Sequence, residues 1–428
     1  MTRRTRAPEK QMLVIYDLLY LIAIVLYLPV FLLRRKFHRG MLSRLGIIPA
    51  DFILERPIWI HAVSLGEAVL IKGLLRELRL AFPNKRFIIS TVTPTGNKIA
   101  KGVADKGDFV TYLPLDLSFI INNFIKRVNP SLFIVAETEI WPNLLNSLHK
   151  RRIPIIAVNA RISDNSFKGY YGIKFLIKPI LNKVSLFCTQ SEHDARRLAH
   201  LGVEKSRLCV TGNMKFDLKP QELKFKPSGL RLKFEEQLWV CGSTHPGEEE
   251  IILAVYKELL EDFSDLRLLL APRHPERSSE VASLAQSLGF KAIKTSSGEQ
   301  PGEDLKVVYI LDSVGELLSF YSIAHIVFVG GSLVKKGGHN ILEPAALGKP
   351  IIFGAQMFNF RDIAQLFLKN KAALQVHNQE ELKNKVRLLL SDPSAIQQLG
   401  QAAKDLIKNN QGATQRNLDC ILSFAKDI

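Results

Sequence analysis

The chain has 428 residues, 47% of them hydrophobic and 23% charged, which allows two domains with sizeable cores and excludes a disordered polymer. Its 58 lysines and arginines against 41 aspartates and glutamates give a formal net charge of +17, which favours an anionic partner. The sequence contains neither an aromatic-interleaved basic motif nor a helix-turn-helix signature, so no nucleic-acid partner is expected. Four cysteines stand singly without a C-x-x-C pair, which predicts apolar core residues rather than a zinc site or a disulfide framework.

Residues 12–33 form an apolar run in which Asp17 is the only charged residue. As a helix this run would be about 33 Å long, roughly the thickness of a bilayer core. Basic residues flank it on both sides, and it lacks the small-residue cleavage site of a signal peptide. We predict that residues 1–50 form an uncleaved membrane anchor with the rest of the protein on the cytoplasmic side. Because both flanks are basic, the sequence leaves two alternatives open: the helix spans the bilayer, or it lies in a single leaflet.

Beyond residue 51, short apolar runs alternate with amphipathic stretches. Runs that are apolar on both faces predict a parallel α/β fold, in which helices cover both sides of a sheet. The alternation pauses over 213–237, so we predict one α/β domain over 51–219, a second over 220–428, and a cleft between them. The predicted strands are Ile58–Val63, Phe87–Thr93, Leu132–Ala136, Ile153–Val158, Leu186–Thr189, Leu238–Cys241, Leu266–Leu270, Val307–Leu311, Ile326–Val329 and Pro350–Phe353.

Polar residues follow several predicted strands of the first half. The S-L-G-E turn at 64–67 fits a capping box, and Glu67 fits equally well as a general base that faces the cleft. Glu137 and Glu139 directly follow an apolar strand, where carboxylates are costly unless paired or functional. Being two residues apart, they would point the same way in an extended stretch. Lys215, at the domain junction, is a candidate contact for an anion.

Similar polar turns follow the strands of the second half. Arg273 is placed to grip a phosphate or ribose, and the densest group is G-G-S-L-V-K-K-G-G-H-N-I-L-E-P-A-A at 330–346. Its glycines let backbone approach a ligand, and a helix predicted to start near Asn340 would direct its positive end at an anion. Glu343, one turn further, can accept from ribose hydroxyls. Together these features indicate a nucleotide-sugar donor site. The sequence shows no P-loop, D-x-D or metal-spaced histidines, so no metal or other cofactor is expected.

Several motifs in chain order resemble those of the 3-deoxy-D-manno-octulosonic acid (Kdo) transferases of lipopolysaccharide synthesis. They are H-A-V-S-L-G-E, T-P-T-G, E-T-E-I-W-P-N, N-A-R-I-S, T-G-N-M-K-F-D, P-R-H-P-E-R and G-G-H-N-I-L-E-P-A. The likeness extends from the N-terminal segment to about Phe360. It implies a glycosyltransferase-B fold, CMP-Kdo as donor, and a lipid A precursor as acceptor at the inner membrane. The acceptor would be a phosphorylated, acylated glucosamine disaccharide.

By position, the resemblance makes Glu67 the proton acceptor, and makes Glu137 and Lys215 residues that support the transition state. Two alternatives stay open: an enzyme of the same architecture that uses a UDP-sugar, and a membrane-attached binding protein that keeps the fold without the chemistry. The joint presence of these three residues argues against the second. The contacts to CMP that the resemblance implies are Pro272, Arg273, Val314, Gly315, Glu316, Asn340, Ile341, Leu342 and Glu343.

Overall fold

The computed structural model describes residues 6–33, 40, 42–49, 52, 54–217, 230, 232–300 and 306–425. The chain divides into two compact units, one made of residues 1–218 together with 411–428, the other of residues 219–410. The C-terminal segment 411–428, which the prediction gave to the second domain, therefore belongs to the first. Most of the predicted junction over 213–237, and the basic flanks at 1–5 and 34–39, lie outside the described residues.

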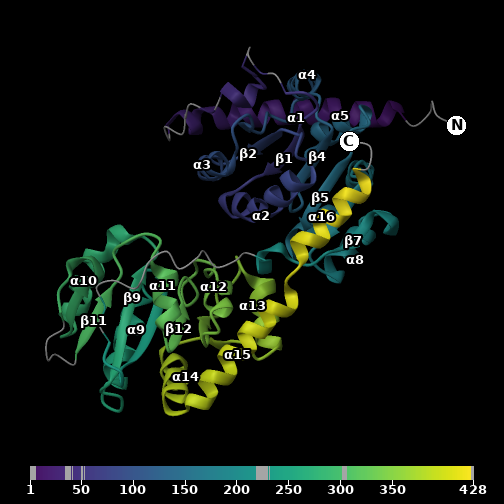
Figure 1. Cartoon of the computed structure of the whole chain (residues 1–428). Coiled ribbons are helices and arrows are strands. Elements are labelled where there is room, and N and C mark those ends of the chain that lie inside the picture. Colours follow the sequence, from purple (N-terminus) through teal and green to yellow (C-terminus); the bar gives the residue numbers. More distant parts are fainter. Residues whose placement is uncertain are drawn as a thin grey trace. The chain divides into compact units, whose positions relative to one another are not determined.

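The first unit is built on a parallel sheet whose described strands follow the order β3-β2-β1-β4-β5-β6-β7 (Figure 1). The inner strands are buried along their whole length, as their continuous apolar runs require. The seven strands are β1 (Ile58–Ala62), β2 (Phe87–Thr91), β3 (Phe109–Tyr112), β4 (Leu132–Ala136), β5 (Ile155–Ala160), β6 (Leu186–Thr189) and β7 (Leu208–Val210).

Helices cover both faces of this sheet. One core contains side chains of α2 (Leu65–Ala81), α3 (Pro94–Val103) and α16 (Ala413–Phe424), with Leu418 and Ile421 from the last. The opposite core is formed by α4 (Ser118–Val128), α5 (Pro142–Lys150), α7 (Lys174–Leu181) and α8 (Glu192–His200), with Trp59 and Phe133 from the sheet. A further helix, α6 (Asp164–Gly172), precedes α7. The C-terminal helix is therefore part of the first unit's core.

The second unit repeats this arrangement with a parallel sheet in the order β10-β11-β9-β8-β12-β13-β14 among the described strands. Its strands are β8 (Gln237–Thr244), β9 (Leu266–Pro272), β10 (Lys291–Lys294), β11 (Val307–Ile310), β12 (Ile326–Val329), β13 (Ile351–Gly354) and β14 (Leu374–Val376). Its helices are α9 (Glu249–Leu259), α10 (Ser278–Ser287), α11 (Leu317–Ile323), α12 (Leu342–Ala346), α13 (Arg361–Lys369), α14 (Gln379–Ser391) and α15 (Pro393–Asn410). The predicted α/β fold of two parallel-sheet domains is thus confirmed.

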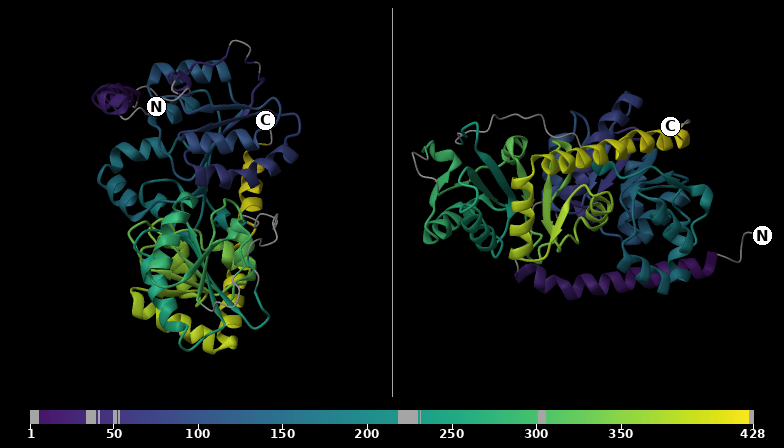
Figure 2. Two further views of the ribbon diagram at one scale, coloured as in Figure 1. Left: turned by 90° about the vertical axis from the view of Figure 1, so that its left-hand side faces the viewer. Right: turned by 90° about the horizontal axis from the view of Figure 1, so that it is seen from below.

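The predicted anchor forms α1 (Arg6–Leu33), a helix of 28 residues that lies alongside the first unit (Figure 2). Asp17, the one charge in its apolar run, faces the unit, where its Oδ1 accepts from Ser118 N at 3.1 Å and from Asn143 Nδ2 at 2.7 Å. Among the described residues, no helix is long and apolar enough to cross a membrane. The spanning form of the predicted anchor is therefore not supported.

Three of the four cysteines, predicted to be separate core residues, lie together in the first unit. The Sγ atoms of Cys209 on β7 and Cys420 on α16 are 3.1 Å apart. Cys188 on β6 lies beside them, and hydrogen bonding to Cys420 together with burial raises the pKa of its thiol. Cys241 is buried alone in the second unit. The spacing of the cysteines along the chain does not indicate this thiol cluster, because it forms only when α16 packs against the first unit.

Candidate active site

Glu67 lies in the first turn of α2, directly after β1. Its Oε1 accepts from the Ser64 hydroxyl at 2.9 Å, and its Oε2 accepts from the Val63 N–H at 2.7 Å. The Ser64 hydroxyl in turn accepts from the Glu67 N–H at 3.5 Å, as in the predicted capping box, except that the carboxylate accepts from the N–H of Val63 and not from that of Ser64. Burial raises the pKa of the Glu67 carboxyl, and the negative charge of Glu137 raises it further. The carboxylate is therefore a stronger base than an exposed one.

Glu137 follows β4 and lies between two cations. Its Oε1 is 3.4 Å from Lys215 Nζ, and its Oε2 is 3.5 Å from Arg161 Nε. Its φ of +59° is left-handed, so the predicted extended geometry of Glu137 and Glu139 is wrong. The two carboxyls nevertheless interact: burial, Glu67 and Glu137 together raise the pKa of Glu139 to about 7. A left-handed φ in a non-glycine residue such as Glu137 is typical of functional sites.

Lys215 lies on a short 3₁₀ turn that a chain of amide contacts holds in place. The Met214 N–H donates to Asn159 Oδ1 at 2.9 Å, and the Asn159 N–H donates to Asn417 Oδ1 at 3.3 Å. Asn417 belongs to α16, and Asp217 accepts from backbone N–H groups at the start of the same helix. The C-terminal helix therefore positions Lys215. Sequence reasoning missed this, since the tail carries no motif.

The structure thus brings Glu67, Glu137 and Lys215 together at the carboxyl edge of the first sheet, where ligands bind in folds of this type. Two acids and a cation are suited to proton abstraction and to stabilising developing charge. Among the described residues, no cluster of histidines, cysteines and acids is arranged to hold a metal ion.

In the second unit, Glu248 holds the glycine-rich turn that follows β12. It is fully buried, and its carboxylate accepts from the backbone N–H groups of His245, Gly331, Ser332 and Leu333 at 2.6–3.1 Å. The sequence analysis gave Glu248 no role. The sequence pattern that could have indicated Glu248 is an acid just after a strand and a polar turn. A residue that only caps a helix shows the same pattern.

Two of the predicted nucleotide-binding groups lie in turns after β9 and β11. Pro272 ends β9, and the Arg273 N–H donates to the last residue of β8 at 2.9 Å. Val314 is 85% exposed, and Gly315 has a φ of +95°, a conformation that favours glycine. The Glu316 carboxylate accepts from a serine hydroxyl of the same turn at 2.7 Å. These residues stay predicted contacts of the nucleotide.

The third predicted group, Asn340 to Glu343, forms a tight turn. Asn340 Nδ2 donates to Glu343 Oε1 at 3.0 Å, and Asn340 Oδ1 accepts from the Leu342 N–H at 3.1 Å. Ile341 and Leu342 are buried, so their side chains pack in the unit. Burial raises the pKa of Glu343, whereas Asn340 and nearby Arg273 lower it. The expected helix begins later, at Leu342, and has five residues, too few for the predicted macrodipole to contribute much.

Two histidines that the sequence analysis passed over lie beside this turn. The Nε2 atoms of His245 and His339 are 2.9 Å apart, and their rings stack. Burial, followed by repulsion from Arg273, lowers the pKa of His339 to about 4. When two neutral imidazoles are joined through their Nε2 atoms, one of them keeps an N–H at Nδ1 that can donate to an anion.

Two parallel α/β units with polar turns at their strand ends are typical of a known class of enzyme. Residues 250–406 match the sequence profile of glycosyl transferases group 1. A UDP-N-acetylglucosamine 2-epimerase structure shares the fold, with a TM-score of 0.60 at 12% identity over 87% of this chain and 97% of that one. A glycosyltransferase from Rickettsia africae does so with a TM-score of 0.56 at 15% identity over 87% and 100%. The protein is a glycosyltransferase with the predicted glycosyltransferase-B type of fold.

The family follows from the first half and from the relatives. Residues 39–218 match the profile of 3-deoxy-D-manno-octulosonic-acid transferase (kdotransferase). The 3-deoxy-D-manno-octulosonic acid transferase of Haemophilus influenzae is 41% identical over 371 residues, which cover 86% of this chain and 87% of that one. That of Rickettsia felis is 36% identical over 376 residues, covering 86% and 79%. The chain belongs to the Kdo transferase family.

Proposed function

We propose that the protein transfers Kdo from CMP-Kdo to a lipid A precursor during lipopolysaccharide synthesis. The single observation that supports this most is the grouping of Glu67 with the Glu137–Lys215 pair, whose Oε1 and Nζ atoms are 3.4 Å apart, at the carboxyl edge of the sheet. Family membership supports Kdo as the transferred sugar, and the resemblance of the second unit's turns supports CMP as its carrier.

In this mechanism Glu67 takes the proton from a primary hydroxyl of the acceptor as its oxygen attacks the anomeric carbon of Kdo. The bond from that carbon to the CMP phosphate oxygen breaks, CMP leaves with the electron pair, and the configuration is inverted. Lys215, held by Glu137, stabilises the negative charge that develops. In the second unit, Arg273 and the Asn340–Glu343 turn hold the nucleotide.

Glu67 can act as a base while it caps α2. A carboxylate has about four lone-pair sites, and two hydrogen bonds occupy two of them. The remaining pairs can accept the acceptor's proton. The capping role and the catalytic role, alternatives from the sequence alone, are therefore compatible in the folded protein.

The proposed location is the cytoplasmic face of the inner membrane, with α1 lying in the plane of the bilayer. While Leu13 is buried, Val14, Leu18, Val25 and Leu26 are 59–73% exposed, so one side of the helix presents apolar surface. The Asp17 contacts hold the opposite side on the protein. An apolar groove of about 630 Å³ between α1 and α7 runs to Ile140, next to Glu139, and suits the acyl chains of the acceptor.

The test is to incubate the purified protein with enzymatically generated CMP-Kdo and a tetraacylated lipid A precursor, and to weigh the lipid by mass spectrometry. A gain of one or more Kdo residues is expected; transfer from a UDP-sugar instead would establish the alternative donor.

Glu67→Gln should abolish turnover while CMP still binds, because Gln preserves the capping box. Glu77→Gln, on the same helix, is the matched control and should retain activity. Retained turnover in Glu67→Gln would rule out its role as base.

A further inference from the structure

A second pocket lies at the opposite edge of the first unit's sheet. Its floor is formed by residues just before β5 and β6, and its volume is about 980 Å³. Strand β5 spans six residues, so roughly 17 Å of sheet separates this amino edge from the carboxyl edge where Glu137 lies. The pocket is therefore distinct from the candidate active site. No part of the mechanism uses it.

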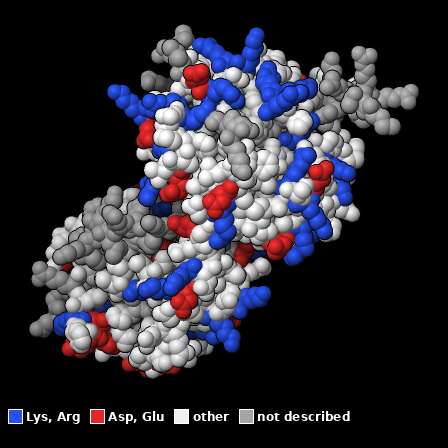
Figure 3. Space-filling view, turned by 45° about the vertical axis from the view of Figure 1, so that its right-hand side comes forward, with Lys and Arg blue, Asp and Glu red and all other residues white. Residues whose placement is uncertain are grey.

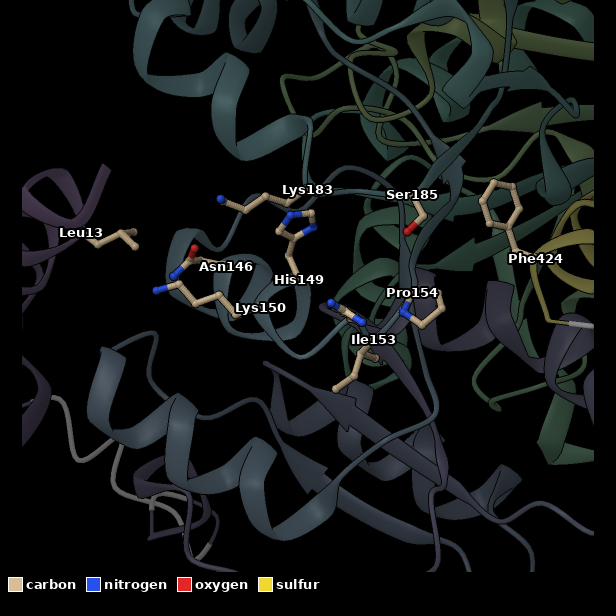
Figure 4. A pocket seen from close by; sticks show the side chains of 10 residues that line it. Leu13, Asn146, His149, Lys150, Ile153, Pro154, Lys183, Ser185 and Phe424 are labelled. Carbon is tan, nitrogen blue, oxygen red and sulfur yellow. The ribbon is translucent and has the colours of Figure 1, made fainter. Parts of the chain in front are cut away.

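The lining of this pocket is cationic. Lys150 ends α5, Arg152 follows in the next turn, and Lys183 and His149 complete the basic side, while none of the ten described lining residues is acidic. Figure 4 shows the side chains of Lys150 and Lys183 extending toward Leu13 of α1. Lys and Arg also predominate over the first unit on the face shown in Figure 3. Cations gathered in one depression favour an anionic occupant.

The pocket also has apolar lining, which includes Leu13 of α1 and Phe424 of α16. Asp17 contacts Asn143 at the start of α5, whereas Leu13 lines the pocket with Lys150 at the end of α5, so the two helices run antiparallel. Phe424 is 43% exposed, whereas Leu13 is buried on the side of α1 that faces the protein. A ligand placed here meets cations and exposed hydrocarbon together. Free phosphate or nucleic acid would satisfy only the cations, whereas a phospholipid satisfies both.

We propose that this pocket binds the headgroup of an anionic phospholipid, with the acyl chains against the exposed side of α1. This proposal rests on the membrane contact of α1 proposed above. A headgroup held at the amino edge and an acceptor groove at the carboxyl edge would fix α1, antiparallel to α5, in the plane of the bilayer. The lipid would then orient the active site toward membrane-borne acceptor.

The experiment uses the full chain and flotation with vesicles of phosphatidylcholine, with and without phosphatidylglycerol. The pocket variant is Lys150→Gln with Arg152→Asn. Both residues are exposed, and Asn tolerates the left-handed φ of +58° at position 152. The matched control is Lys98→Gln with Lys101→Gln, which removes the same charge from α3 on the other face of the sheet. Thermal unfolding of both variants checks that they fold.

Phosphatidylglycerol should strengthen the binding of the wild type and of the control. The affinity of the pocket variant for vesicles with phosphatidylglycerol should fall about thirtyfold, since each basic residue at an anionic bilayer contributes about fivefold to the affinity. Binding to phosphatidylcholine alone, which reports α1, should be unchanged. Equal losses in the two variants would overturn the proposal, as would displacement from vesicles by inorganic phosphate at constant ionic strength. If the wild type binds phosphatidylcholine without any gain from phosphatidylglycerol, only the headgroup site fails. If it binds neither vesicle, the membrane contact itself fails, while the lipid-transfer assay in detergent still tests the chemistry.

Discussion

Replacing Glu248 by Gln should loosen the glycine-rich turn of the second unit. Each carboxylate oxygen of Glu248 accepts two backbone N–H groups, and the side chain is fully buried. Gln keeps one oxygen and directs an NH₂ group at the other two donors. Hydrogen bonds to a charged group contribute about 1.5–3 kcal/mol each, so losing two costs roughly 3–6 kcal/mol. That is a large part of the stability of a typical domain.

The assay is hydrogen exchange followed by mass spectrometry on the whole chain, together with calorimetric titration of CMP. Peptides that cover Gly331 to Leu333 should exchange faster, and CMP should bind more weakly. Glu250→Gln is the matched control, since this exposed residue accepts a single bond from the Gly247 N–H at 2.9 Å and should change exchange little. Equal exchange at Gly331–Leu333 in the two variants would refute the reasoning that the buried carboxylate holds the turn.

Three further predictions concern the first unit. Burial and neighbouring acids raise the pKa of Glu139 to about 7, so its proton stabilises the fold below its unfolded pKa, and this contribution is lost as pH rises through about 7. Denaturation between pH 5 and 7 should show a slope that Glu139→Gln reduces; an unchanged slope would contradict it. Asn417→Ala should destabilise the first unit by about 1–3 kcal/mol, because a buried hydrogen-bonded group is lost. It should also lower turnover by displacing Lys215, and full activity would contradict this positioning role. Diamide should join Cys209 and Cys420 with loss of two hydrogens, seen by peptide mass; persistence of both thiols would show that α16 packs elsewhere.

The inner strands of both sheets could be predicted from sequence, and the outer strands could not. Sequence reasoning missed β3, β7, β10 and β14, which are the edges of the two sheets. An inner strand is buried on both faces and reads as a continuous apolar run. An edge strand such as β10, Lys291–Lys294, is short, partly exposed and rich in lysine, as protected edges commonly are. Such a segment resembles a loop.

The site was predictable to the extent that its residues lie just after inner strands. Glu137 and Arg273 do so, and strand-end polarity indicates both. The support of Lys215 was not predictable, because it depends on α16. Asn417 contacts Asn159, and Asp217 in the Lys215 turn contacts Gly412, which is 195 residues further along the chain. A contact over that separation depends on the tertiary fold and leaves no local pattern.

A carboxylate after a strand has several possible roles, and its hydrogen-bond partners separate them. Glu248 accepts four backbone N–H groups and has little capacity left for a substrate, so it is structural. Glu67 accepts two protein hydrogen bonds and keeps lone pairs for a proton. Glu137 contacts Lys215 and Arg161 at 3.4–3.5 Å, distances that leave both cations able to reorient toward developing charge. A carboxylate whose lone pairs are all used by the protein therefore serves the fold, whereas one with lone pairs left can take part in the chemistry. The comparison of Glu67→Gln with Glu248→Gln tests this. Glu67→Gln should stop turnover while the fold stays intact, and Glu248→Gln should weaken the fold of the second unit.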